Sequence, residues 1–280
     1  MTNTNDTVLV LGGTGRTGRR VADRLAARGV PVRLGSRSAA PAFDWADRAT
    51  WPEALAGVGA VYVSYQPDLA VPGAVETVES FTRLAVASGV RRVVLLSGRG
   101  EPEAHQAEKA VANVVDGVGG RWTVVRASWF HQNFSEGPFA DGIREGTLYL
   151  PVGDVREPFV DADDIADVAV AALLADGHAG EVYEVTGPRL LTFAEAVAEI
   201  AAATGRPVSL VPVALAEYVD ALRGAGVPAD VVSLLTYLFT EVLDGRNQSL
   251  TDGVARALGR APADFADYAR AAAATGVWTA

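Results

Sequence analysis

The sequence feature that most constrains the fold of this chain is a glycine-rich turn between a predicted strand and a predicted helix. Val8–Leu11 is a continuous apolar run, and Gly12–Gly18 follows at once with the sequence GGTGRTG. In a strand–turn–helix unit Gly12 allows a tight turn, Gly15 lets the backbone approach a pyrophosphate, and Gly18 lets the helix pack closely. The helix N-terminus favours the bound anion through its N–H groups and dipole. The sequence therefore predicts a dinucleotide site at this turn.

The residues after the second apolar run indicate which dinucleotide binds. A site for NAD usually has an Asp or Glu about 20 residues past the glycines, which holds the ribose 2′-hydroxyl. This chain has Ser36 and Arg37 there, and no carboxylate occurs between Asp23 and Asp44. A guanidinium beside a hydroxyl suits a 2′-phosphate, and Arg16 would add a second positive charge. We expect NADP(H); the alternative is that Arg37 is only a solvated loop residue.

Strand and helix signals alternate along the first half of the chain. Continuous apolar runs, typical of parallel strands covered on both faces, occur at 8–11, 30–34, 60–64, 92–97 and 122–126. Helix-like segments lie between them at about 51–57, 74–88 and 104–116. We interpret Asp44-Trp45 as a further short strand. The alternation predicts an α/β fold, a Rossmann-type doubly wound parallel sheet with right-handed crossovers.

The second half is expected to be mostly helical. Thr192 and Glu195 form a capping box that opens a helix, which Gly205 ends. Short strands are expected at 147–150 and 207–213, and further helices at 165–174, 214–223, 228–243 and 262–274. We expect an NADP(H)-binding domain over residues 1–150, with strand contributions from about 155–190. A smaller C-terminal substrate lobe would span 151–280.

Composition excludes several classes of site and partner. The chain has no cysteine, which excludes disulfides, thiolate nucleophiles and cysteine-ligated metals. A net charge of −10 disfavours nucleic acid, and no apolar run approaches the roughly 20 residues that span a bilayer. The first residues lack the layout of a signal peptide. We expect a cytoplasmic protein with a small-molecule substrate, no metal and no nucleic-acid or membrane partner, and leave a homodimer open.

Polar residues near the ends of two predicted strands are candidates for chemistry. Ser64 and Tyr65 end one strand and Ser97 ends another, so they would open onto the cofactor cleft. Tyr65 and Ser97 could donate hydrogen bonds to a substrate carbonyl, although polar residues often end strands. His105 and Lys109 lie one turn apart on a predicted helix, and either could supply a proton if its pKa is lowered. A solvated charged face is the alternative.

An aromatic segment follows the last of these strands. Trp129, Phe130 and Phe134, with the amide of Asn133, would give the apolar wall with few polar groups that a flat ring substrate needs. For the two phenylalanines, plain packing is an equal alternative. The acidic residues at 161–164 precede a helix, which favours capping over metal binding.

These residues together resemble the NmrA-like group of atypical short-chain dehydrogenases/reductases. The resemblance rests on LGGTGRTG at 11–18, Arg37, WTVVR at 122–126 with the aromatic segment after it, and PFVDADDIA at 158–166. It continues through the helix after Thr192 to Phe265 and so covers nearly the whole chain. It implies an NADP(H)-binding Rossmann domain with a small substrate lobe. Members include quinone- and dye-type reductases, and regulators that bind the cofactor without turning it over.

The chain departs from the wider superfamily at the usual catalytic pair. Ordinary members have Tyr-x-x-x-Lys, whereas this chain has His105 and Lys109 at that spacing. Related phenylpropanoid reductases keep a lysine on this helix, which places Lys109 ahead of His105. We expect an NADPH-dependent reductase of a small conjugated carbonyl, quinone or similar acceptor. A non-catalytic NADP(H)-binding redox sensor acting through a protein partner is the alternative, and the missing tyrosine disfavours an epimerase-like enzyme.

The expected site residues fall into three groups. Cofactor binding is expected from Gly12, Thr14, Gly15, Arg16, Thr17, Gly18, Ser36, Arg37, Asp44, Trp45, Ser64 and Ser97. Catalysis is expected from Lys109, Ser97, Tyr65 and His105. The substrate pocket is expected to include Trp129, Phe130, Asn133 and Phe134.

Overall fold

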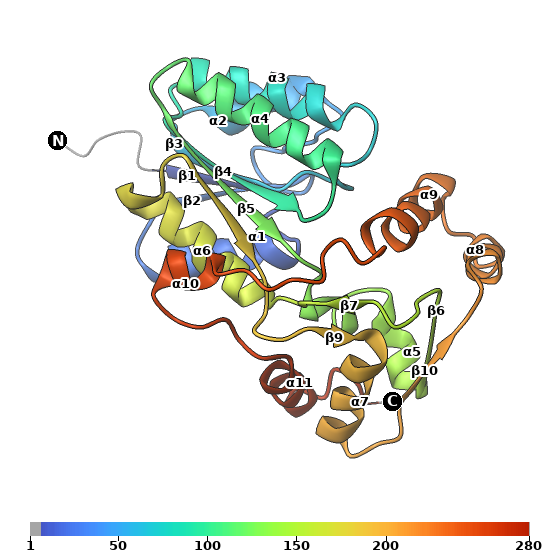
Figure 1. The fold of residues 1–280 in the computed structure, drawn as a ribbon. Coiled ribbons are helices and arrows are strands. Elements are labelled where there is room, and N and C mark those ends of the chain that lie inside the picture. The colour runs from blue at the N-terminus through green and yellow to red at the C-terminus, as the bar shows by residue number, and fades with distance from the viewer. Residues whose placement is uncertain (1–6, 280) are drawn as a thin grey trace. The chain divides into compact units, whose positions relative to one another are not determined.

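A computed structural model describes residues 7–279 (Figure 1). They form two compact units that interleave along the chain. The first contains residues up to Ala127 together with 162–185 and 252–260. The second contains residues 128–161 and 186–251 and the chain from Ala261 onward. The expected division into a cofactor domain over 1–150 and a substrate domain over 151–280 stays a prediction.

The first unit is built on a six-stranded parallel sheet in the order β2-β1-β3-β4-β5-β8. Its strands are β1 (Thr7–Leu11), β2 (Val32–Gly35), β3 (Val58–Val63), β4 (Arg92–Gly98), β5 (Arg121–Ala127) and β8 (Glu181–Val185). The strand order reverses beside β1, which is the arrangement of a doubly wound sheet. The predicted fold class is therefore confirmed.

Helices cover both faces of this sheet. They are α1 (Arg16–Ala27), α2 (Trp51–Leu55), α3 (Ala74–Ala87), α4 (Pro102–Asp116), α6 (Ala162–Leu174) and α10 (Gly253–Leu258), with short 3₁₀ turns at Arg48–Thr50 and Asp176–His178. Figure 1 shows α2, α3 and α4 on one face, and α1 and α6 on the other. Because both faces are covered, the strands lack the alternation of polar and apolar residues that a half-exposed sheet shows.

Charged side chains join α1 to α6. The guanidinium of Arg24 donates to Asp163 and to Asp167, at 2.6 Å each, and Arg20 donates to Asp163 at 3.2 Å. On the same helix Asp164 pairs with Arg260 at 2.6 Å. The acidic start of α6 thus binds arginines. Within residues 7–279 no group of three His, Asp or Glu side chains could hold a metal ion.

The second unit has five helices and two small two-stranded sheets among its described residues. The helices are α5 (Phe139–Glu145), α7 (Phe193–Thr204), α8 (Leu215–Gly224), α9 (Ala229–Tyr237) and α11 (Phe265–Ala274), with a 3₁₀ turn at His131–Phe134 and a π-helical turn at Leu238–Val242. β6 (Thr147–Leu150) pairs with β10 (Ser209–Pro212), and β7 (Arg156–Glu157) pairs with β9 (Leu191–Thr192). The predicted capping box is present, because the Glu195 N–H donates to Thr192 Oγ1 at 3.0 Å and the Thr192 N–H donates to Glu195 Oε2 at 2.8 Å.

The predicted strand at Asp44-Trp45 is wrong. Asp44 forms only an isolated bridge to Asp47, because side chains take its backbone groups. Its N–H donates to Thr50 Oγ1 at 3.0 Å, and its carbonyl accepts from the Trp51 indole at 2.9 Å. These bonds compete with a sheet ladder.

Two helical predictions also need correction. The helix expected over 228–243 is α-helical only to Tyr237 and continues as the π-helical turn. The sequence did not predict α10, which packs so closely on β8 that a Cβ on Gly253 would lie 2.0 Å from the Glu184 carbonyl oxygen. Tertiary contact therefore fixes a helix of six residues that is too short to be stable alone. No helix among residues 7–279 is long and apolar enough to cross a membrane.

The turn between β1 and α1 depends on backbone-to-backbone packing. Gly12 adopts φ +64°, and its carbonyl accepts from the Gly15 N–H at 2.8 Å. A Cβ on Gly18 would lie 2.1 Å from that same carbonyl oxygen. Only glycine lets α1 approach the turn this closely.

We predict that Gly18→Ala lowers the free energy of unfolding by about 1–3 kcal/mol, because overpacking forces α1 away from the turn. Urea unfolding measures this loss. Gly153→Ala is the control, since a Cβ there meets nothing within 4 Å. Equal stability of the two variants would contradict this account of the turn.

Candidate functional site

A cavity of about 620 Å³ lies where β1, β2 and β3 end. Its walls come from the loops that follow these strands, as expected of a doubly wound sheet, in which ligands bind beyond the carboxyl ends of the strands. The volume lies within the range of small-molecule sites, roughly 300–1,000 Å³. The predicted cofactor residues that line it are Gly12, Thr14, Gly15, Ser36, Arg37, Asp44 and Trp45.

The shape and charge of this cavity fit a dinucleotide phosphate. The glycine turn forms one wall, and α1 begins there with no side-chain cap and no acidic residue in its first turn. Arg37 and Arg48, both exposed, line the cavity with Ser36. Backbone N–H groups at a helix start and guanidinium groups both favour phosphate.

Aromatic side chains form a flat wall beside these cations. The half-buried Trp45 donates from its indole to the Ser64 carbonyl at 3.3 Å, and its ring lies 5.0 Å from Tyr65 and 4.9 Å from Phe43. Tyr65, predicted as a catalytic residue, thus lines this cavity. The sequence analysis missed Arg48 and Gln66, which also line it. Arg48 could have been found as a second arginine soon after Arg37.

The other predicted cofactor residues near the glycine turn pack against it or lie at the start of α1. Gly18 packs against Gly12, and Thr17 is buried beside it at the start of α1, where Arg16 is the first residue. Ser64 is buried as well, and its Oγ would lie 3.3 Å from a Cβ on Gly12. These residues shape the turn, and their contact with a cofactor stays a prediction.

Ser97 is held by a buried ion pair. Its hydroxyl donates to Glu108 Oε1 at 2.6 Å, and Arg126 Nε donates to the same oxygen at 2.9 Å. A hydroxyl has one proton to donate, so in this arrangement Ser97 offers only lone pairs to a ligand. Its predicted role as donor to a substrate carbonyl stays a prediction that requires the bond to Glu108 to break.

The ion pair continues across the ends of β4, β5 and β8. Arg126 also binds Glu184 at 2.5 Å, and the buried Arg99 donates to the other oxygen of Glu184 at 3.3 Å. Burial alone would raise the pKa of Glu184, but hydrogen bonds and charge from Arg126 and Arg99 lower it below its ordinary value. The network therefore keeps fixed charges at this edge of the sheet.

The two candidates on α4 occupy different environments. Lys109 is exposed, whereas His105 is half-buried, and its buried Nε2 has no hydrogen-bond partner among residues 7–279. Glu108, which precedes Lys109 on α4, is the residue of this helix that contacts Ser97. The predicted catalytic roles of Lys109 and His105 stay predictions.

The sequence analysis missed a buried carboxyl group at the same edge. Glu101 follows β4 and is only 6% exposed. Burial raises its pKa to about 9, and the charge and hydrogen bonding of Asp68 act in the same direction. The sequence could have indicated this group, because Glu101 follows directly after residues 97–100, where a predicted strand ends.

The predicted substrate-pocket residues lie in the second unit. Trp129 is half-buried and packs on Phe193 and Phe239, with ring centroids 5.4 and 5.5 Å apart. Phe134 has no exposed surface and belongs to the aromatic core of this unit. The described contacts of Phe134 are therefore those of the packing alternative. Phe130 and Asn133 are half-buried, and their contact with a substrate stays a prediction.

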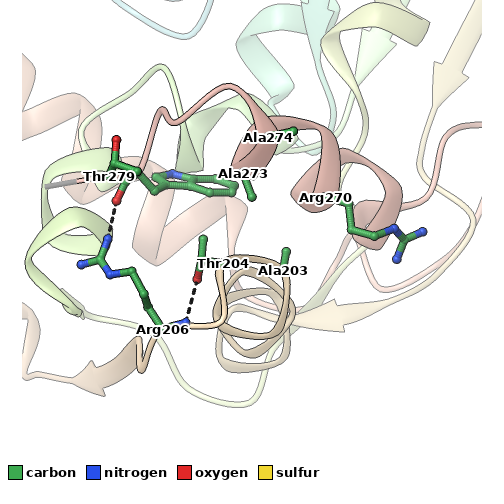
Figure 2. Close-up of a pocket in the computed structure, with 8 residues that line it drawn as sticks. Ala203, Thr204, Arg206, Arg270, Ala273, Ala274 and Thr279 are labelled. Carbon is green, nitrogen blue, oxygen red and sulfur yellow. Dashed lines mark hydrogen bonds between the residues drawn. The ribbon is translucent and has the colours of Figure 1, made fainter.

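A second cavity, of about 370 Å³, lies between α7 and the C-terminal segment of the second unit (Figure 2). Figure 2 shows Arg206 reaching the backbone near Thr279, where its guanidinium donates to the Trp278 carbonyl. None of the predicted site residues lines this cavity.

Comparison with known proteins decides the family. The model of the NmrA-like family matches residues 4–269. The chain belongs to this family. It is 32% identical to an NAD(P)H azoreductase of Xenophilus azovorans, over 95% of this chain and 98% of that protein. It is 33% identical to an agroclavine dehydrogenase of Claviceps fusiformis, over 94% of this chain and 96% of that protein.

A solved structure shows the same fold. The NADPH-dependent quinone oxidoreductase of Escherichia coli, solved with NADPH, matches with a TM-score of 0.73 at 21% identity, over 94% of this chain and 98% of that one. The NmrA-like chain described here is an NAD(P)H-dependent oxidoreductase of the atypical short-chain dehydrogenase/reductase group. The predictions of family and enzyme class are confirmed.

The raised pKa of Glu101 gives a pH-dependent stability. Between its ordinary pKa of 4.5 and about 9, the folded protein keeps a proton that the unfolded chain has lost. Its unfolding free energy therefore falls as pH rises through this window, by at most about 1.4 kcal/mol per pH unit. We predict that Glu101→Gln removes this slope, so that the variant gains stability relative to wild type from pH 5 to about pH 9.

Urea unfolding across pH checks this prediction. Glu53→Gln is the control, because Glu53 is an exposed carboxylate in the first turn of α2. Parallel curves for wild type and Glu101→Gln would show that Glu101 ionises in the folded state as it does in the unfolded chain.

Proposed function

We propose that this protein uses NADPH to reduce a small, flat, conjugated acceptor of the quinone, azo or conjugated carbonyl type. The observation that carries the choice of cofactor is the cavity wall made by Ser36, Arg37 and Arg48 beside the glycine turn. Two guanidinium groups and a hydroxyl match a 2′-phosphate. When bound, NADPH supplies a hydride, which is the cofactor's own chemistry.

The relatives support the class of acceptor. By their names, one acts on azo compounds, one on agroclavine and one on quinones. Azo compounds and quinones share conjugated groups that take up a hydride. The half-buried Trp129, with Asn133 as a polar group, would give such a ring an apolar surface with one point of orientation.

The residues of the sheet edge would position the cofactor and the acceptor. We propose that the glycine turn holds the pyrophosphate and that Trp45 and Tyr65 flank the cofactor. Ser97, whose hydroxyl donates to Glu108, would accept a hydrogen bond from the cofactor. Lys109 would stabilise negative charge that develops on the product oxygen.

The proposed function is tested by NADPH consumption with quinones, azo dyes, conjugated ketones and aldehydes as acceptors. We predict turnover with at least one class and a Kd for NADPH below that for NADH. Tight NADPH binding without turnover across the panel would instead favour the redox-sensor alternative. The histidine in place of the usual catalytic tyrosine also favours that alternative. The homodimer stays a prediction.

We predict that Arg37→Ala reduces the preference for NADPH over NADH. A charged hydrogen bond contributes about 1.5–3 kcal/mol, which corresponds to roughly a 10- to 100-fold change in the ratio of the two Kd values. Arg48→Ala should lower the ratio in the same direction. The control is Arg28→Ala at the end of α1, outside the cavity wall. A binding titration with unchanged preference in both cavity variants would refute the phosphate site.

A further inference from the structure

Two carboxyl groups meet at the edge of the sheet where the cofactor cavity lies. Asp68 comes directly after Tyr65, Gln66 and Pro67, which line that cavity, and Glu101 comes shortly after the end of β4. β3 and β4 are neighbouring parallel strands, so both loops emerge at the edge where ligands of such sheets bind. Asp68 therefore lies in a loop that lines the cavity, and Glu101 lies in the loop after the neighbouring strand.

The side chain of Glu101 folds back on the last residue of β4. A Cβ on Gly98 would lie 2.2 Å from Glu101 Oε1 and 2.7 Å from Oε2. The carboxyl group thus fills the space that a side chain at position 98 would occupy. It is buried, whereas Asp68 is half-buried and so retains contact with solvent.

The surroundings of Glu101 keep a proton on it. Its Oε2 is buried and receives no N–H or O–H from the described residues, and Asp68 is its hydrogen-bonding neighbour. Two carboxyl groups can share a hydrogen bond only if one is protonated. On α4, Glu103 adds negative charge, and His105 lies one turn on. Arg99, the nearest cation along the chain, is directed to Glu184.

We propose that Glu101, backed by Asp68, is the proton donor of the reduction; this inference rests on the proposed reductase function. The hydride of NADPH brings two electrons to the acceptor, and the O–H bond of Glu101 breaks to give its proton to the acceptor oxygen that becomes negative. NADPH is oxidised, the acceptor is reduced, and the two additions convert a quinone to a hydroquinone. Two carboxylates then face each other, so Glu101 regains a proton from solvent through Asp68.

The other candidates at this edge are less suited to give a proton. The hydrogen of Ser97 is directed to Glu108, and the exposed Lys109 is hydrated. Glu101 combines burial, which preserves the proton at neutral pH, with a partner that favours its return. With Glu101 as the proton donor, Lys109 would stabilise the negative charge that develops on the product oxygen.

The first test compares Glu101→Gln with wild type, using 2-methyl-1,4-naphthoquinone as acceptor at saturating NADPH. We expect kcat to fall by about 10²- to 10⁴-fold, the range for loss of a general acid, with the Kd for NADPH changed less than about 2-fold. Glu53→Gln should match wild type. Asp68→Asn should move the alkaline limb of the kcat–pH profile to lower pH, because Asp68 no longer raises the pKa of Glu101. An unmoved limb, or unchanged kcat in Glu101→Gln, would overturn the proposal.

A second acceptor separates proton donation from a structural role. A cationic triphenylmethane dye takes up a hydride and becomes neutral, so its reduction needs no proton. Glu101→Gln should therefore reduce the dye at nearly the wild-type rate while quinone reduction is lost. Equal losses with both acceptors would assign Glu101 a structural role and overturn the proposal.

A third measurement needs no turnover. In cofactor-free protein, the stability of Glu101→Gln relative to wild type must rise with pH, as derived above, if Glu101 holds a proton. A flat difference would overturn the donor role even if the enzyme is active. If the difference rises but wild type reduces no acceptor, the reductase function fails, and the donor role fails with it.

Discussion

The contact between Gly18 and the carbonyl of Gly12 is the constraint on which the cofactor half depends. It lets α1 start directly behind the turn of β1 and brings the helix N-terminus to the edge of the sheet. The arginines of α1 then reach the acidic start of α6. One backbone contact without a side chain thus fixes both the glycine turn and the packing of two helices on that face.

Charge is arranged at the same edge in two different ways. Arg126, Glu108 and Glu184 balance one another, and this keeps Ser97 in one orientation. The Glu101 carboxyl lacks such a cation, so burial and Asp68 favour its protonated form. The pKa of Glu101 is therefore raised and that of Glu184 lowered, because Glu184 binds arginines, a contrast that also separates acids from fixed charges in enzyme sites.

The second unit has an aromatic core of its own. Phe134 contacts Phe139, Phe159 and Phe265, with ring centroids 5.4–5.5 Å apart. Trp129 lies at the rim of this core and keeps part of its surface accessible.

The sequence by itself determined five of the six parallel strands and the glycine turn, because hydrophobic periodicity and glycine spacing are local signals. It also located Arg37, the capping box at Thr192 and the family. Only the tertiary structure decided which polar groups meet. Ser97 and Glu108 lie on different elements, as do Glu101 and Asp68, and α10 exists only because Gly253 fits against β8. Protonation depends on burial and on neighbours distant in the chain, so no local pattern could have shown that Glu101 keeps its proton while Glu184 loses its own.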